Sequence, residues 1–332
     1  MKAFELRPGH PDDALTLVTR PSPALGPADV RVRVRAVSLN YRDLAILRGA
    51  ASRTAPVVPL SDGAGEVVEV GAAVTRWRVG DRVTASFFPT WHHGELSEAA
   101  HAQALGGSRD GMLAEEVVLP EAAWVRIPAH LSFEQAATLP CAGVTAYQAL
   151  FEATHLTPGD TVLVQGSGGV SIFALQLARA AGARVVATSK SAAKAERLRA
   201  LGASDVIDYR AVPAWGAAVR ELTGGVDVAV EVGGAGTFDQ SVQALRFGGT
   251  MSLIGVLTGA RGEVDLHAMF RKRLKVAGVY VGSVEMAEHF ARILAHTSIE
   301  PIIDQVFEFA DARAAYARLA TGEHFGKLVV RV

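Results

Sequence analysis

The stretch VLVQGSGGVS (residues 162–171) carries the residues best suited to hold an anionic ligand. Gly166, Gly168 and Ser171 stand where a dinucleotide-binding turn has three glycines, which allow a tight bend, close backbone approach to a pyrophosphate, and close packing of helix on strand. Serine is small enough to meet the third demand in part. We expect the pyrophosphate at the N-terminus of the following helix, against Gly166, Ser167, Gly168, Gly169 and Val170. A strand-to-helix turn with no ligand is the alternative.

The type of dinucleotide is indicated about 20 residues further on, where NAD-binding proteins carry an acidic side chain for the ribose hydroxyls. The stretch ATSKSAAK (187–194) has no acid there. Ser189, Lys190 and Lys194 instead offer hydrogen bonds and positive charge to a 2′-phosphate. The sequence therefore predicts NADPH, with a merely solvated helix start as the alternative for the lysines.

The elements around the turn indicate a parallel sheet. Strand-like runs alternate with helical patterns of ten or more residues, a βαβ arrangement, at 161–165, 183–188, 226–232 and 250–256. The helix after the turn has one apolar face, made by Val170, Phe173, Ala174, Leu177 and Ala181. Gly182 is placed to end that helix. This context favours the dinucleotide interpretation over an empty turn.

The first third of the chain is mostly β. Valine and arginine alternate from Val30 to Ser38, which predicts a half-buried strand, and short glycine-punctuated runs at 63–71 and 79–85 predict further strands. Residues 87–112 have little periodicity and are expected to form a loop or lobe. The chain ends in another strand-like run, GKLVVRV.

Length and composition restrict the class of protein. A chain of 332 residues, 49% hydrophobic and 20% charged, predicts two domains and contains no apolar run long enough for a membrane span. The N-terminus lacks a secretory signal, and the single cysteine, Cys141, cannot form an internal disulfide, so we expect a cytoplasmic protein. A net charge of −1 with dispersed basic residues argues against nucleic acid and leaves a small-molecule substrate.

Seven motifs together resemble the medium-chain dehydrogenase/reductase superfamily, in its zinc-independent, quinone-oxidoreductase-like branch. They occur in the expected order and span nearly the whole chain: VSLNYRDL (37–44), DGAGEVVEVG (62–71), VGDRV (79–83), LPCAGVTAYQAL (139–150), GDTVLVQGSGGVS (159–171), LGASDVIDYR (201–210) and GEHFGKLVV (322–330). The resemblance implies a Rossmann domain with a doubly wound parallel sheet, inserted in a β-rich, GroES-like catalytic domain, with the active site between them.

The resemblance also implies domain limits and cofactor contacts. The GroES-like domain is expected at 1–123, the Rossmann domain at 124–265, and the return to the catalytic domain at 266–332, with an extension of the Rossmann sheet near 274–282. In similar NADPH-using enzymes, residues matching Lys194 and Tyr209 lie near the adenosine phosphate. Residues matching Thr145 and the segment Gly255, Val256 and Leu257 approach the nicotinamide.

The chain departs from the zinc-dependent members of this superfamily. Asn40, Ser61 and Cys141 match the positions of their catalytic zinc ligands, and one soft ligand of three is too few to hold zinc. Ala45 stands near the position of their relay histidine. A substitute site from His92, His93 and His101 is disfavoured, because adjacent histidines on an extended chain point to opposite faces. We expect no metal.

Without a metal to stabilise an alkoxide, the easier hydride chemistry is reduction of an activated double bond, whose negative charge spreads onto oxygen. We therefore expect NADPH to reduce a quinone or an α,β-unsaturated carbonyl, with Asn40 and Tyr41 at the polar end of the substrate. Tyr41 could donate the proton, because a phenol is protonated at neutral pH. The alternatives are structural: Asn40 caps a helix that begins near Arg42, and Tyr41 packs between domains.

Two other functions stay open at this point. One is a metal-free alcohol dehydrogenase or ketone reductase, and the other is a dinucleotide-binding protein with little catalysis, since a fold alone does not select a function. Relatives in the superfamily are usually dimers or tetramers, so a homo-oligomer is expected.

Overall fold

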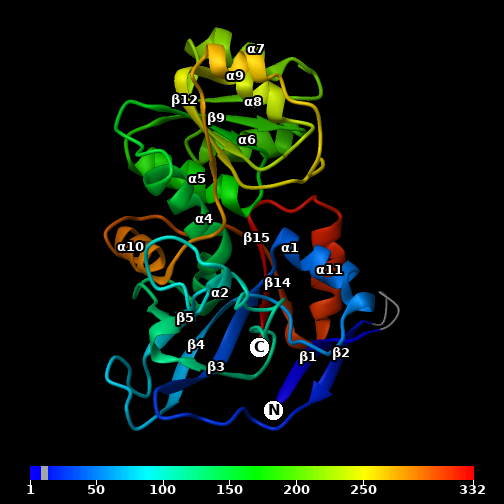
Figure 1. Cartoon of the computed structure of the whole chain (residues 1–332), viewed down its shortest axis with the longest axis vertical. Coiled ribbons are helices and arrows are strands. Elements are labelled where there is room, and N and C mark those ends of the chain that lie inside the picture. The colour runs from blue at the N-terminus through cyan, green and yellow to red at the C-terminus, as the bar shows by residue number, and fades with distance from the viewer. Residues whose placement is uncertain (9–13) are drawn as a thin grey trace. The chain divides into compact units, whose positions relative to one another are not determined.

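The computed structural model describes residues 1–8 and 14–332, which form two compact units. Unit 1 comprises Met1–Val144 and Val281–Val332, and unit 2 comprises Thr145–Tyr280. Both ends of the chain therefore belong to unit 1, as Figure 1 marks. Within the described residues, no helix combines the length and the hydropathy that crossing a bilayer requires.

Unit 1 is built on a mixed seven-stranded sheet, in the order β14-β15-β3-β4-β5-β7 with β6 paired to β3, and a separate two-stranded sheet of β1 and β2. Only β14 and β15 run parallel. The strands are β1 (Lys2–Leu6), β2 (Leu15–Thr19), β3 (Asp29–Ser38), β4 (Asp62–Val70), β5 (Arg82–Ala85), β6 (Glu116–Pro120), β7 (Trp124–Arg126), β14 (Ile303–Glu308) and β15 (Lys327–Arg331).

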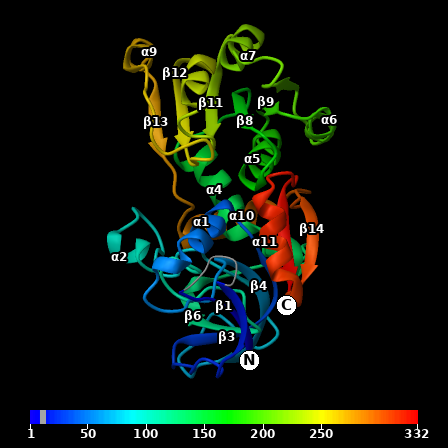
Figure 2. The same ribbon diagram turned by 90° about the vertical axis from the view of Figure 1, so that its right-hand side faces the viewer.

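Helices cover parts of this sheet. They are α1 (Tyr41–Arg48), α2 (Glu98–His101), α3 (Phe133–Ala136), α10 (Val284–Ala295) and α11 (Ala312–Ala320), with shorter helical turns at Ala50–Ser52, Glu121–Ala123, Leu139–Gly143 and Phe309–Asp311. The chain passes into unit 2 within α4 (Val144–Tyr147). Figures 1 and 2 show α1 beside α11, two helices from opposite ends of the sequence.

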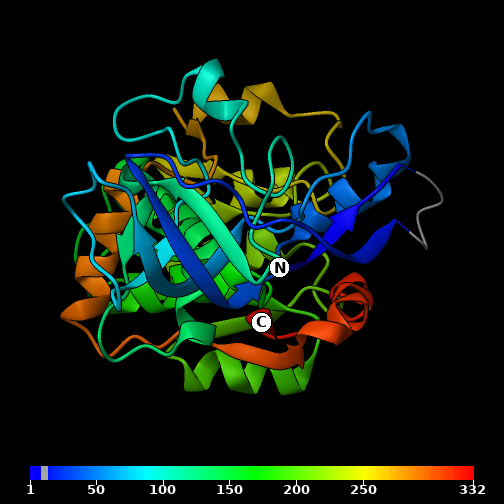
Figure 3. The same cartoon turned by 90° about the horizontal axis from the view of Figure 1, so that it is seen from below.

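The long strand β3 confirms the predicted alternation. Val30, Val32 and Val34 are buried, while Arg33 on the other face is exposed. Arg31 lies opposite Glu69 of β4, and its Nε donates to the Glu69 carboxylate at 2.8 Å. Figure 3 shows β3 as a long blue strand with its partners alongside. The valine face is thus covered and the arginine face carries cross-strand ion pairs.

Unit 2 contains a six-stranded parallel sheet in the order β10-β9-β8-β11-β12-β13. The strands are β8 (Thr161–Gln165), β9 (Arg184–Ser189), β10 (Asp205–Asp208), β11 (Val226–Glu231), β12 (Leu245–Leu253) and β13 (Lys275–Gly278). The helices are α5 (Gly169–Ala180), α6 (Ala192–Ala200), α7 (Trp215–Thr223), α8 (Phe238–Ala244) and α9 (Leu266–Arg271), with a helical turn at Gln148–Glu152. Figure 2 shows β13 at one edge. The predicted arrangement, a doubly wound parallel sheet together with a second, β-rich unit, is observed.

The chain passes from unit 1 to unit 2 after Val144 and returns to unit 1 after Tyr280. Both crossings come later in the sequence than the predicted limits after residues 123 and 265. β7 pairs with β5 and so extends the sheet of unit 1 beyond residue 123. β13 pairs with β12 and keeps residues up to Tyr280 in unit 2, in the segment where an extension of the Rossmann sheet was expected. Strand pairing over long sequence distances sets both limits, and the local pattern of residues does not report it.

Candidate functional site

The predicted dinucleotide turn connects β8 to α5. Gly166 has φ +68°, a left-handed conformation that L side chains rarely adopt, so the bend itself requires glycine. Gly168 is extended and caps α5, and a Cβ added there would meet no atom within 4 Å. Space therefore remains open in front of the backbone where a phosphate would approach, and the first N–H groups of α5 have no partner within the helix. This geometry fits a pyrophosphate.

Ser171 does more than fit in place of the third glycine. Its buried hydroxyl donates to the carbonyl oxygen of Gln165 at 2.6 Å, across the whole turn. The turn is also tied to the neighbouring strand, since the Gly166 N–H donates to the carbonyl of Thr188 at 2.9 Å. Ser171 thus stabilises the turn with a hydrogen bond that a glycine at this position could not form.

A buried carboxylate lies at the end of the adjacent strand. Glu231 closes β11, is completely buried, and accepts hydrogen bonds from Gln165 Nε2 at 2.6 Å, from the Gly233 and Gly234 N–H groups at 2.8 and 2.9 Å, and from two hydroxyls. The hydroxyls belong to Thr237, at 2.6 Å, and Ser241. Five donors satisfy the carboxylate, as a buried charge requires.

This pair of residues lies at the switch point of the sheet. β8 and β11 are neighbours although the chain order reverses between them, and ligands of such folds bind at the carboxyl ends of the strands at that point. Gln165 ends β8 directly before the glycine turn, and its Oε1 also accepts from the N–H of Gly233 at 3.1 Å. The glycine turn and the loop after β11 are therefore held to each other by Gln165 and Glu231.

The segment predicted to contact the nicotinamide follows β12. The Gly255 N–H donates to the carbonyl of Glu231 at 3.1 Å, and a Cβ at Gly255 would overlap the backbone of Val232. Val256 and Leu257 are half exposed. Thr145, at the start of unit 2, is buried. The structure thus joins Gly255 to the loop after β11.

The residues predicted to bind the 2′-phosphate lie at the ends of β9 and β10. The Tyr209 N–H donates to the carbonyl of Ser189 at 3.2 Å, which brings those two residues together. The Ser189 hydroxyl contacts the backbone of Ser191, and Ser191 caps α6 through the N–H of Lys194. Lys190 directly precedes that cap. Both lysines therefore flank the N-terminus of α6, whose positive dipole end favours an anion.

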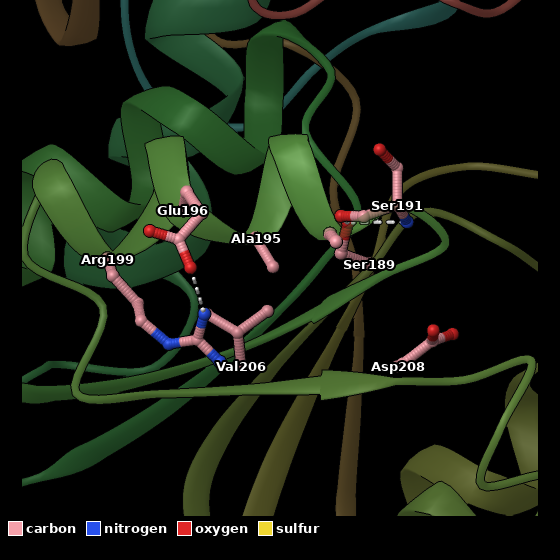
Figure 4. Close-up of a pocket in the computed structure, with 8 residues that line it drawn as sticks. Ser189, Ser191, Ala195, Glu196, Arg199, Val206 and Asp208 are labelled. Atoms are coloured by element: carbon pink, nitrogen blue, oxygen red, sulfur yellow. Dashed lines mark hydrogen bonds and ion pairs between the residues drawn. The ribbon is translucent and has the colours of Figure 1, made fainter.

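A pocket of about 200 Å³ opens next to these residues, between α6 and β10. Figure 4 shows Ser189 and Ser191 on one wall, Asp208 opposite, and the Arg199–Glu196 ion pair at 3.5 Å. The pocket is lined by Ser189, Ser191, Ala192, Ala195, Glu196, Arg199, Val206 and Asp208. It is smaller than most ligand sites, and its arginine is already paired.

The two predicted catalytic residues begin α1 in unit 1. Asn40 is the N-cap residue and is 9% exposed, whereas Tyr41 is 45% exposed. The Asn40 N–H donates to Asp43 Oδ2 at 2.7 Å, the arrangement of one half of a capping box. The Asn40 side-chain oxygen accepts from Lys327 Nζ at 2.5 Å, and its Nδ2 has no hydrogen-bond partner within the described chain. Asn40 therefore occupies the N-cap position that the structural alternative gave it, with Asp43 as its capping-box partner.

Three side chains match the catalytic zinc ligands of the zinc-dependent relatives: Asn40, Ser61 and Cys141. The Ser61 hydroxyl donates to Asp62 Oδ1 at 2.7 Å, and the Cys141 N–H donates to Asp62 Oδ2 at 3.2 Å. Burial raises the pKa of the Cys141 thiol, and the Asp62 carboxylate raises it further. An amide, a hydroxyl and one thiol supply a single soft ligand, and the Asn40 oxygen already accepts from an ammonium, so these residues do not fit a catalytic zinc. No group of three potential metal ligands occurs in the described part of the chain.

Asp43 is a second titratable group whose pKa burial raises in this cluster. Burial raises its pKa to about 6, against the lowering effect of Arg42, whose Nη1 lies 3.8 Å from Asp43 Oδ1. Asp62 acts to raise this pKa and Lys327 acts to lower it. Ionisation of Asp43 is therefore less favourable in the folded protein than in the unfolded chain, and the carboxyl takes up a proton near pH 6.

Replacing Asp43 with asparagine is expected to raise the free energy of unfolding at about pH 8 by roughly 2 to 3 kcal/mol, and to change it little at about pH 4. The native-state pKa near 6 exceeds the unfolded value of about 3.9, so the native state binds more protons between these values. Wild-type stability consequently falls as pH rises through this window. Asparagine cannot ionise, yet it still accepts the Asn40 N–H. Urea denaturation at several pH values measures the difference.

The Asp81→Asn variant is the matched control with the opposite sign. Hydrogen bonds from Arg126 lower the pKa of Asp81, so its charge stabilises the fold at neutral pH and that contribution is lost as pH falls. D81N should be destabilised near neutrality and resemble the wild type in acid. If the Asp43→Asn protein is no more stable than the wild type at about pH 8, the raised pKa of Asp43 is contradicted.

Several residues of these clusters were not anticipated from the sequence: Asp43, Asp62, Gln165, Glu231, Thr237, Ser241 and Lys327. Some left a signal. An aspartate three residues after Asn40 matches a capping box, and Glu231 is an acid at the end of an otherwise apolar run, VDVAVE. Lys327 likewise opens the apolar strand KLVVR. Buried charge within an apolar pattern calls for partners, although the pattern does not identify them.

A parallel sheet with a glycine turn at its switch point, carried by a chain with a second, β-rich unit, is typical of two-domain dinucleotide-binding proteins. Comparison with known proteins agrees. The family model of the alcohol dehydrogenase GroES-like domain matches residues 26–129, and that of the zinc-binding dehydrogenase matches residues 169–296.

Individual relatives match nearly the whole chain. A zinc-type alcohol dehydrogenase-like protein of Schizosaccharomyces pombe is 40% identical over 93% of this chain and 92% of its own length. A quinone oxidoreductase of Pseudomonas aeruginosa is 32% identical over 92% of this chain and 91% of its own. A solved NAD-dependent alcohol dehydrogenase is 34% identical, covers both chains fully, and superposes with a TM-score of 0.91. The chain belongs to the medium-chain dehydrogenase/reductase superfamily and is an NAD(P)H-dependent oxidoreductase.

Proposed function

We propose that the protein is an NADPH-dependent, zinc-independent reductase of activated double bonds, in quinones or α,β-unsaturated carbonyl compounds. The observation that carries this proposal is the state of the three zinc-ligand positions. Asn40 Oδ1 faces an ammonium, the Ser61 hydroxyl is bound to Asp62, and Cys141 is left as one soft ligand of three. A metal-free site favours substrates whose negative charge spreads by conjugation. The quinone oxidoreductase of P. aeruginosa supports this class of substrate.

Preference for NADPH rests on the end of β9. Ser189, Lys190, Lys194 and Tyr209 offer hydrogen bonds and positive charge, and two of them flank the N-terminus of α6. β9 itself contains no acid, and Asp208, which lies opposite Ser189, belongs to β10. When bound, the cofactor supplies a hydride. The glycine turn and Thr145, Gly255, Val256 and Leu257 would hold its pyrophosphate and nicotinamide.

Asn40 and Tyr41 are proposed to contact the polar end of the substrate. The Asn40 amide would donate to the carbonyl oxygen, and the exposed Tyr41 phenol would supply the proton.

Replacing Tyr41 with phenylalanine is expected to lower kcat for a good enone by roughly 100-fold if the phenol is the proton donor. The half-exposed position predicts unchanged thermal stability, so a loss of turnover would report chemistry. Tyr280→Phe is the control, since it removes a phenol that is exposed to the same extent and that has no assigned contact with the cofactor or the substrate. Unchanged turnover in Y41F would assign the proton transfer to water.

One experiment tests the function as a whole. Consumption of NADPH and of NADH is measured with a panel of quinones, enones, aldehydes and secondary alcohols, together with the zinc content of the purified protein. We expect turnover of the conjugated acceptors with NADPH and less than one zinc per chain. A tenfold preference for NADH, as the name of one solved relative would suggest, would contradict the roles of Ser189, Lys190 and Lys194.

The second candidate is an alcohol dehydrogenase, which the name of the S. pombe relative favours. Oxidation of secondary alcohols in the same panel, or reduction of ketones, without zinc, would establish it in the metal-free form. A protein that binds NADPH but turns over none of these substrates would be the third, weakly catalytic case.

A homo-oligomer is proposed on the strength of one open sheet edge. β13 is the edge strand of the six-stranded sheet, and Val276, with Leu266 and Phe270 on the preceding helix, is exposed. An unpaired strand edge next to apolar side chains favours pairing with another chain, and here a second copy is the simplest partner. Light scattering of the wild type and a Val276→Lys variant measures the association.

A further inference from the structure

Lys327 carries a buried amino group with no carboxylate beside it. The side chain is 4% exposed, and among the described residues it forms no ion pair with an acidic side chain. Nζ donates instead to the Leu39 carbonyl at 2.6 Å and to Asn40 Oδ1 at 2.5 Å. A buried charge needs such partners, and here both come from the two residues that lead into α1.

Strand pairing holds Lys327 in this place. β15 runs antiparallel to β3, with Val329 opposite Ser38, and the Leu39 N–H donates to the Leu328 carbonyl at 3.1 Å. The turn before Lys327 uses Gly326 at φ +83°, where a Cβ would overlap the Ile302 carbonyl. Backbone hydrogen bonds on both sides thus fix the distance between the ammonium and Asn40.

The ammonium determines which way the Asn40 amide faces. A lysine ammonium has three donors and no acceptor, so the amide group must present its oxygen to Lys327. Nδ2 is then directed away from Lys327, and it is buried without a hydrogen-bond partner in the described chain. Asp43 holds the main chain of the same residue through its bond from the Asn40 N–H. A fixed donor therefore remains for a ligand.

We propose that Lys327 is a positioning residue that orients the Asn40 amide so that Nδ2 donates to the carbonyl oxygen of the substrate. This rests on the proposed function. In that reduction a hydride forms a new C–H bond at the β-carbon, the π electrons of the C=C bond move toward the carbonyl, and its oxygen carries the charge of an enolate. A proton from Tyr41 or water then completes the product at the α-carbon. Nδ2 stabilises the oxygen while it is charged, and the nearby ammonium adds to that effect through Oδ1.

Asn40→Asp separates the donor from the packing. An aspartate keeps the contact with Lys327 as an ion pair but has no N–H to donate. We expect kcat with an enone to fall about 100-fold, while the Kd for NADPH and the melting temperature stay close to the wild type. Lys327→Met removes the ammonium and lets the amide rotate. We expect kcat to fall about tenfold, which is less than the fall caused by removing the Asn40 donor.

A double-mutant cycle distinguishes positioning from simple support of the fold. If Lys327 acts through the amide, Lys327→Met lowers kcat in the wild type but not in an Asn40→Ala background. Lys272→Met is the matched control, because Lys272 is also a buried lysine that donates to backbone carbonyls, those of Val242, Gln243 and Leu245. It should cost stability without changing kcat. Equal losses from Lys327→Met in both backgrounds, or no loss in either, would overturn the proposal.

A second readout does not need turnover. The side-chain NH₂ signals of Asn40, identified by their absence in Asn40→Ala, should be separate and well resolved in NMR spectra of the wild type and broaden or move in Lys327→Met. Unchanged signals would overturn the proposal even with an active enzyme. If the wild type reduces no conjugated acceptor, the proposed function fails, and these signals still report whether Lys327 orients the amide. Lys327→Gln serves both experiments if the methionine variant does not fold.

Discussion

Replacing Gly168 with valine is expected to weaken NADPH binding by about 100-fold or more, with little change in the stability of the cofactor-free protein. Gly168 has an extended backbone that valine adopts readily, and a Cβ there meets no protein atom within 4 Å. The added side chain would fill only the space through which the backbone approaches a pyrophosphate. Fluorescence titration with NADPH measures the loss, and thermal unfolding without cofactor tests the fold.

Gly278→Val is the matched control. A Cβ added at Gly278 would also meet no atom within 4 Å, and the residue has no positive φ, but it lies in β13 away from the turn. Its variant should bind NADPH like the wild type. Wild-type affinity in G168V would place the pyrophosphate elsewhere than at the start of α5.

Replacing Glu231 with alanine is expected to lower the free energy of unfolding by about 3 to 5 kcal/mol and the melting temperature by roughly 10 °C. The Gly234 N–H has no other acceptor within the described chain, and the side chains of Gln165, Thr237 and Ser241 lose their shared partner. A buried donor left without an acceptor costs more than the bond it made. Differential scanning calorimetry or denaturant titration gives the number.

Two controls accompany this variant. Asp239→Ala removes an exposed acid from α8 and should change stability little. Glu231→Gln keeps the shape and one acceptor, and the exchange Glu231→Gln with Gln165→Glu restores an amide and a carboxylate in facing positions, so it should recover part of the loss. If the Glu231→Ala protein melts within about 2 °C of the wild type, the buried carboxylate does not stabilise the fold as predicted.

The sequence was most informative where a local pattern reflects a local cause. The alternation in β3, the end of α5 before Gly182 and the start of β8 follow from spacing and from glycine chemistry, and these are confirmed. The single apolar face predicted for α5 is confirmed only in part, because Phe173, Ala174 and Leu177 are buried but so are residues on its other sides, such as Ile172 and Leu175. The domain limits differ because they depend on the pairing of β7 with β5 and of β13 with β12. Sequence spacing does not report pairings over such distances.

The residues of the candidate site also fall into those that a local motif predicts and those that only the folded chain reveals. Gly166 and Gly168 could be assigned from the sequence, because their conformations are set by a motif of neighbouring residues. The partners of Asn40 and Gln165 could not, since Lys327 and Glu231 lie far away in the chain and only the folded sheets bring them near. The roles of Asn40 and Tyr41, and the contacts of the cofactor residues, stay predictions.

The bond between Gln165 and Glu231 joins positions 66 residues apart. The glycine motif therefore does not contain all the residues that fix its conformation. A fragment that ends before β11 would include every glycine of the turn but would lack the Glu231 carboxylate that holds the end of β8. During synthesis, the turn can acquire its final shape only after the second half of the Rossmann sheet has emerged and paired. We expect competence to bind a dinucleotide to arise in one late step of folding.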